Sequence, residues 1–80
     1  MKKYIATFYS HYGALCFKRN CEKQGMEAEI MPVPRNLSSS CGTCVRFACG
    51  EEALPEITEE LEQIAEILEE GYRTVYRAEE

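Results

Sequence analysis

The sequence of 80 residues predicts an α+β fold, a ferredoxin-like βαββαβ domain. Two observations carry this prediction. Four β-prone segments alternate with two segments of helical spacing, and glycine and proline fall between them. This topology forms a four-stranded antiparallel sheet with strand order 4-1-3-2 and both helices on one face. A chain of this length makes one domain, which we expect to span residues 1–80.

The first strand and the first helix have clear boundaries. Residues 4–9, Tyr-Ile-Ala-Thr-Phe-Tyr, are β-prone and predict strand one. Ser10 is suited to cap a helix over residues 11–24, because its hydroxyl can accept a hydrogen bond from the first turn. Gly25 is the expected stop. The residues that share one face of this helix by spacing are Ala14, Phe17 and Cys21.

The remaining elements complete the pattern. Residues 27–33 predict strand two, and Pro32 within it indicates an edge strand, because proline cannot donate to a neighbouring strand. Residues 44–49 are apolar and predict strand three. Residues 55–70 predict helix two, and residues 72–77 predict strand four. The apolar stripe of helix two consists of Ile57, Leu61, Ile64, Ala65 and Leu68.

Composition and charge narrow the class of protein. Hydrophobic residues make up 45% of the chain and charged residues 29%, which is typical of a globular protein. The net charge of −5 argues against nucleic acid as the main partner. No apolar run predicts a signal peptide or a membrane span, so we expect a cytoplasmic protein with no membrane partner. A chain this small has no room for a cofactor-binding cavity, and we expect no cofactor.

Two of the five cysteines, Cys41 and Cys44, form a Cys-Gly-Thr-Cys motif at the end of a turn-prone segment, residues 34–43. An odd number of cysteines in a reducing compartment argues against a disulfide framework. A Cys-x-x-Cys motif is half of a zinc site, but Cys49 lies about 16 Å beyond Cys44 along a strand. The sequence therefore predicts no metal site within one chain, and leaves open a metal that bridges two chains.

Thiol chemistry is the other use of this motif. A thiolate is the nucleophile, and its pKa falls near cations and helix N-termini. The predicted topology places the motif near the start of helix one. One cysteine of the pair can attack, and the other can resolve the product as a disulfide. The groups that we predict to stabilise an anion there are Arg35, Ser38, Ser39, Ser40, Gly42, Arg46 and His11. The cysteines that we interpret as packing residues are Cys16, Cys21 and Cys49.

Several segments resemble a known family. Ile-Met-Pro-Val-Pro-Arg at residues 30–35, Leu-Ser-Ser-Ser-Cys-Gly at 37–42 and Val-Arg-Phe at 45–47 resemble the selenium/sulfur carrier-like family of small bacterial proteins. His-Tyr-Gly-Ala at residues 11–14 also resembles that family. The resemblance implies a carrier that holds sulfur or selenium as a persulfide or selenosulfide and hands it to a partner enzyme. It maps the loaded cysteine onto Cys41, with Cys44 as its partner.

Three functional hypotheses follow. The first is a carrier that receives sulfur or selenium from a donor such as a cysteine desulfurase, with Arg35 and Arg46 stabilising the anion on Cys41. The second is a redox or sensor module in which Cys41 and Cys44 cycle between dithiol and disulfide. The third is a small metal-binding or interaction domain. For this domain, the sheet face opposite the helices would allow a homodimer.

Overall fold

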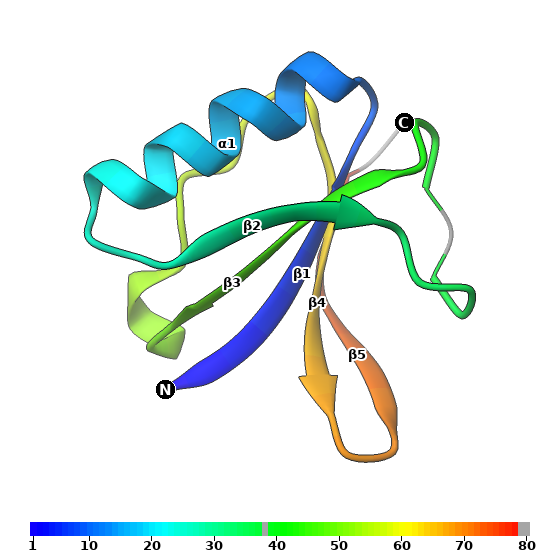
Figure 1. The fold of residues 1–80 in the computed structure, drawn as a ribbon. Coiled ribbons are helices and arrows are strands. Elements are labelled where there is room, and N and C mark those ends of the chain that lie inside the picture. The colour runs from blue at the N-terminus through cyan, green and yellow to red at the C-terminus, as the bar shows by residue number, and fades with distance from the viewer. Residues whose placement is uncertain (38, 79–80) are drawn as a thin grey trace.

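The structure, a computed structural model, describes residues 1–37 and 39–78. One sheet and one helix account for most of these residues (Figure 1). The elements in chain order are β1 (Lys2–Phe8), α1 (His11–Lys23), β2 (Ala28–Pro32), β3 (Thr43–Cys49), the 3₁₀ turn η1 (Glu51–Ala53), β4 (Leu61–Leu68) and β5 (Gly71–Arg77). No helix in the described residues is long and apolar enough to span a membrane.

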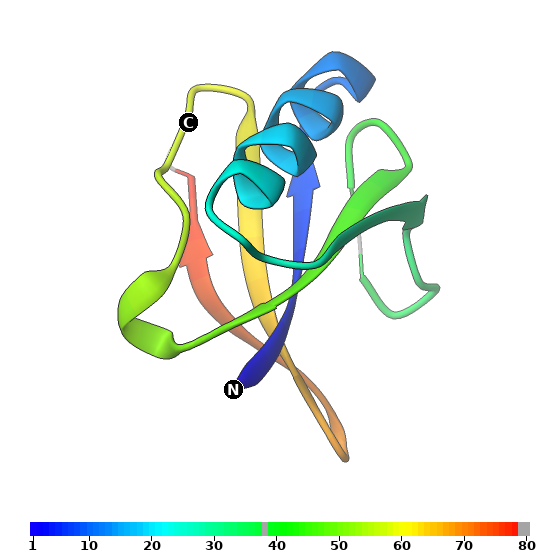
Figure 2. The ribbon, with the colours of Figure 1, turned by 60° about the vertical axis from the view of Figure 1, so that its left-hand side comes forward.

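The sheet has five strands in the order β2-β3-β1-β4-β5, and every neighbouring pair is antiparallel. Helix α1 packs over β1, β2 and β3 on one face of the twisted sheet (Figure 2). The predicted ferredoxin-like fold is therefore wrong. The described residues form five strands and one α-helix, in place of four strands and two helices.

The error lies in the segment predicted as helix two, which forms strand β4. Leu61 and Ile64 are three residues apart, as on one face of a helix, but a bulge in the β1–β4 pairing puts both on the same face of the sheet. Strand β4 is also buried on both faces, so apolar and polar residues do not alternate along it. Both effects hide the two-residue period by which a strand is recognised.

The core lies between α1 and the sheet. Its aromatic centre is a chain of ring contacts, with centroids 5.0 Å apart for Phe8 and Phe17, 5.3 Å for Phe17 and Phe47, and 5.4 Å for Phe47 and Tyr4. The helix face predicted from spacing is confirmed, because Ala14, Phe17 and Cys21 are all buried. Aromatic pairs at these separations add to the stabilisation from burial alone.

The other sheet face is buried at its centre, while Lys3, Glu29 and Arg46 on the same face are exposed. Side chains that alternate with the core residues along β1, β3 and β4 are buried as well: Ile5, Thr7, Cys44, Gln63 and Ala65. The connection before β3 reaches this side, since Asn36 and Leu37 line a pocket together with Gln63 and Tyr72. The sheet face opposite the helix, on which the homodimer was predicted, is therefore open only in part, and the homodimer stays a prediction.

The caps of α1 were predicted correctly. The Ser10 hydroxyl accepts a hydrogen bond from the backbone N–H of Gly13 at 3.1 Å and donates one to the Glu60 carboxylate. Gly25 follows the C-cap with a φ of 81°, a left-handed conformation that glycine adopts without steric cost. The start of the helix is thus tied to the segment that leads into β4.

Replacing Gly13 by alanine is expected to destabilise the fold. A Cβ at position 13 would lie 2.5 Å from the Cβ of Glu60, so α1 would have to move away from that segment. We expect a loss of about 1–3 kcal/mol in the free energy of unfolding, despite the better helix propensity of alanine. Urea unfolding measures it. Gly50→Ala is the matched control, because nothing lies within 4 Å of its Cβ position, and equal stability of the two variants would contradict the packing.

Candidate functional site

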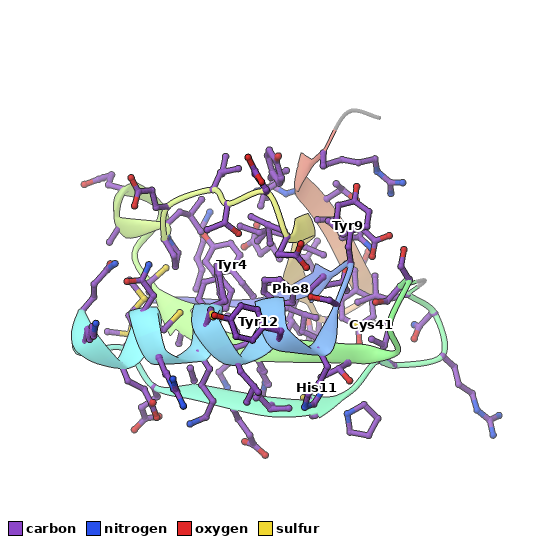
Figure 3. The ribbon with its side chains drawn as sticks, turned by 90° about the horizontal axis from the view of Figure 1, so that it is seen from above. Tyr4, Phe8, Tyr9, His11, Tyr12 and Cys41 are labelled. Atoms are coloured by element: carbon purple, nitrogen blue, oxygen red, sulfur yellow. The ribbon has the colours of Figure 1, made fainter. Side chains whose placement is uncertain are left out.

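The Cys-Gly-Thr-Cys motif lies where β3 begins, beside the first residue of α1. The Nδ1 atom of His11 and the hydroxyl of Thr43 are 3.3 Å apart, which joins the helix start to the motif. Figure 3 shows Cys41 and His11 at the same end of α1. The predicted proximity of the motif to the helix N-terminus is confirmed by this contact. Such a position favours negative charge on a neighbouring group.

Cys41 is the accessible thiol of the motif. It is half-buried, it packs against the edge of the core, and its Sγ donates a weak hydrogen bond to the carbonyl of Thr43 at 3.5 Å. Gly42 follows with a φ of 75°, which favours glycine, and its carbonyl accepts a hydrogen bond from the backbone N–H of Val33 at 3.1 Å. The turn therefore leaves Cys41 only half-buried, in contrast to the buried Cys44 that follows it in β3.

Cys44 has a different environment. Its side chain is 0% exposed within β3, and its Sγ lies 3.7 Å from the carbonyl of Pro32. Burial raises the pKa of the Cys44 thiol to about 11, and the neighbouring Cys41 thiol adds to the shift. Cys44 is thus a neutral, covered thiol near neutral pH in this conformation, and a poor nucleophile.

The remaining cysteines divide between core and surface. The packing interpretation is confirmed for Cys21 and Cys49, which belong to the core cluster, and is wrong for Cys16, which is exposed. All five cysteines are free thiols. Within the described part of the chain, no three side chains of His, Cys, Asp or Glu are placed to hold a metal ion.

The buried thiols predict a loss of stability in alkali. Burial raises the pKa of Cys21, like that of Cys44, to about 11. The unfolded chain releases these protons near pH 9 and the folded protein only near pH 11. Their stabilisation is therefore complete below about pH 8.5 and is lost as the pH rises through about 11. The free energy of unfolding falls by on the order of 2 to 3 kcal/mol for each thiol over this pH range.

Urea unfolding at pH 8 and pH 11 measures this loss, and a variant carrying Cys21→Ala and Cys44→Ala isolates it from the titration of lysines and tyrosines. We expect the variant to lose less stability between the two pH values than the wild type. An equal loss in both proteins would contradict the raised pKa values.

The serines before Cys41 have separate roles. Ser40 donates from its backbone N–H and its hydroxyl to the Glu62 carboxylate, at 3.2 and 2.8 Å, and Thr7 donates its hydroxyl to the same carboxylate at 3.1 Å. The Ser39 hydroxyl is buried and has no hydrogen-bond partner within the described residues. Ser38, also predicted as a donor, lies outside the described residues. Of the two described serines before Cys41, Ser39 is therefore the one whose hydroxyl has no acceptor among the described residues.

The two arginines are not in contact with Cys41. Arg35 is exposed in the connection between β2 and β3, and Arg46 is exposed on β3, where it lines a shallow pocket with Lys3 and Glu29. Neither arginine forms an ion pair or a hydrogen bond with any residue that the structure describes. Their role in stabilising an anion stays a prediction.

Sequence reasoning missed the acidic side of the site. Glu60 and Glu62 lie in the segment predicted as helix two, outside its apolar stripe, and the structure places them against Ser10 and Ser40. Thr7 was read as an ordinary strand residue. No local pattern marks these residues, because their positions depend on the bulge that opens between β1 and β4.

The comparisons identify the class of protein that carries this fold and motif. A model of the family described as "Putative Se/S carrier protein-like" matches residues 3–75, so the chain belongs to that family. Among curated proteins, the uncharacterized protein YtiA of Escherichia coli is 30% identical over 66 residues, which cover 76% of this chain and 78% of that protein. No solved structure matches the chain. The resemblance found in the sequence is confirmed.

Proposed function

We propose that this protein is a cytoplasmic carrier that holds sulfur or selenium as a persulfide or selenosulfide on Cys41. The observation that carries the proposal is the contrast between the two motif thiols: Cys41 is partly exposed at a turn, and Cys44 is fully buried. The family description supports the same cargo. Five free cysteines suit a reducing compartment.

Loading is an exchange at a sulfur atom. The Cys41 thiolate attacks the terminal sulfur of a persulfide on a donor enzyme such as a cysteine desulfurase. The donor's S–S bond breaks, its cysteine leaves as a thiolate, and Cys41 gains the sulfur in a new S–S bond. No net electrons are transferred. Delivery repeats the step, with a thiolate of the acceptor enzyme as the attacking group and Cys41 as the leaving thiolate.

The loaded sulfur is anionic near neutral pH, because a persulfide is more acidic than a thiol. The Ser39 hydroxyl is the donor best supported for this anion, since a buried hydroxyl without a partner costs about 1–3 kcal/mol that a bound atom would offset. Gly42 permits close approach of the backbone. We propose Arg35 and Arg46 as supporting charges that act at longer range, and the His11 ring as a hydrogen-bonding group beside Thr43. The Ser40 hydroxyl is a donor only if it leaves Glu62.

A disulfide between Cys41 and Cys44 is the second candidate function, that of a redox or sensor module. Its support is the proximity by which the Cys41 thiol raises the pKa of Cys44. The Cys44 thiol would first have to leave the carbonyl of Pro32 and become exposed from its buried position in β3. The same exposure would be needed for Cys44 to aid release of the cargo.

Incubation with a cysteine desulfurase and cysteine, without reductant, tests the proposal. Intact mass spectrometry and cyanolysis of the repurified protein should report one added sulfur per chain, and a parallel reaction with selenocysteine and its lyase tests selenium. A disulfide with no added sulfur would favour the redox module, and an unmodified protein would contradict the carrier.

A further inference from the structure

We propose that Glu62 is a positioning residue for Cys41, which lies in the turn before β3. Its carboxylate holds the backbone N–H and the hydroxyl of Ser40, the residue that directly precedes Cys41. The proposal rests on the proposed function only in taking Cys41 as the loaded cysteine. Glu62 does not touch the cargo, and it acts through Ser40.

The carboxylate is fixed from the side of the sheet as well as from the loop. One oxygen accepts from the Ser40 hydroxyl at 2.8 Å, and the other accepts from the Ser40 N–H at 3.2 Å and from the Thr7 hydroxyl at 3.1 Å. Thr7 is 0% exposed on the central strand of the sheet, so its hydroxyl is held in one position. Hydrogen bonds to an ionised acceptor are stronger than those between neutral groups.

The backbone places Glu62 for this contact. Thr7 pairs with Gln63 and Phe8 pairs with Leu61, so Glu62 is the extra residue of a bulge in β4. A bulge turns a side chain away from its regular direction, and bulges are frequent beside functional sites. The Glu62 carbonyl accepts a hydrogen bond from the N–H of Ala78 at 2.9 Å, which fixes the backbone at the bulge.

This arrangement sets the direction of the Cys41 thiol. With Ser40 held, the chain turns at Gly42 and the Cys41 Sγ stays beside the carbonyl of Thr43. Without the carboxylate, the backbone N–H and the hydroxyl of Ser40 both lose their acceptor. We then expect Cys41 to sample more orientations. A freer thiol reacts faster with a small reagent. It is loaded more slowly by a donor enzyme, because transfer between two proteins needs one orientation.

Alkylation of each cysteine by iodoacetamide, followed by peptide mass spectrometry, tests the proposal without any sulfur transfer. We compare the wild type with Glu62→Gln and Ser40→Ala. Glu59→Gln is the matched control, because Glu59 is exposed on the same segment. At a pH where the thiol is ionised, Glu62→Gln should raise the Cys41 rate roughly two- to tenfold, and Glu59→Gln should not. The double variant of Glu62→Gln with Ser40→Ala should show less than the sum of the single effects.

Cys44 serves as an internal control in the same experiment. If Glu62 only stabilises the fold, Glu62→Gln will speed the labelling of the buried Cys44 as much as that of Cys41, and the proposal is overturned. Equal Cys41 rates in Glu62→Gln and wild type would also overturn it. Loading is measured separately, so a wild type that takes up no sulfur rejects the carrier and leaves the positioning result standing.

Discussion

Replacing Cys41 by serine is expected to reduce sulfur loading to background, and replacing Cys44 by alanine is expected to leave it near the wild-type level. A serine hydroxyl cannot form a persulfide, and no other thiol of the motif is exposed in the folded protein. Cys44 is buried with a pKa raised to about 11, so almost none of it is thiolate at neutral pH. Cyanolysis of each variant after reaction with the donor enzyme measures the loading.

Alanine is the better replacement at position 44, because a serine hydroxyl would be buried there without an assured partner. Cys16→Ser is the matched control for a thiol outside the motif, since Cys16 is exposed on α1. Loss of loading in Cys44→Ala, with a urea midpoint like that of the wild type, would show that loading needs both thiols and would contradict the assignment to Cys41 alone.

The largest effect on stability is expected for Phe47→Ala. Phe47 is 2% exposed, and its ring contacts those of both Tyr4 and Phe17, so the substitution leaves a cavity between the sheet and α1. We expect a loss of about 3–5 kcal/mol in the free energy of unfolding. Since small domains are stable by only about 5–15 kcal/mol, this loss is a large part of the total stability.

Arg46→Ala is the control for this prediction, because Arg46 lies next to Phe47 on β3 and is exposed. Its stability should lie within about 0.5 kcal/mol of the wild type. Urea unfolding followed by circular dichroism measures both variants. Similar midpoints for the two would mean that the aromatic chain does not form the centre of the core.

The sequence predicted those elements whose signals are local. Strand β1 has a run of β-prone residues, and α1 has a serine cap, a buried face and a terminal glycine, all within a few positions of one another. Strand β4 could not be recognised, because its bulge and its burial on both faces replaced the alternation of a strand with spacing typical of a helix. One misread segment changed the fold from four strands and two helices to five strands and one helix.

The residues of the candidate site divide in the same way, into those with a local signal in the sequence and those without one. Cys41, Gly42 and His11 could be predicted as site residues because the turn and the helix start are visible in the sequence, and their roles stay predictions. Glu62 lies 22 residues from Ser40 and 55 from Thr7, and only the tertiary fold brings the three together. The difference in exposure between Cys41 and Cys44 could not be predicted either, because burial of the first residues of β3 depends on what covers that face of the sheet.

Localisation of the added atom on the wild-type protein tests the central claim most directly. Trypsin cleaves after Arg35 and Arg46, so residues 36–46 form one peptide that contains both motif cysteines. After loading and alkylation, fragmentation of this peptide should place the extra sulfur or selenium on Cys41, with Cys44 carrying only the alkyl group added after unfolding. An extra atom on Cys44, or on the exposed Cys16 with residues 36–46 unmodified, would contradict the assignment of the carrier site to Cys41.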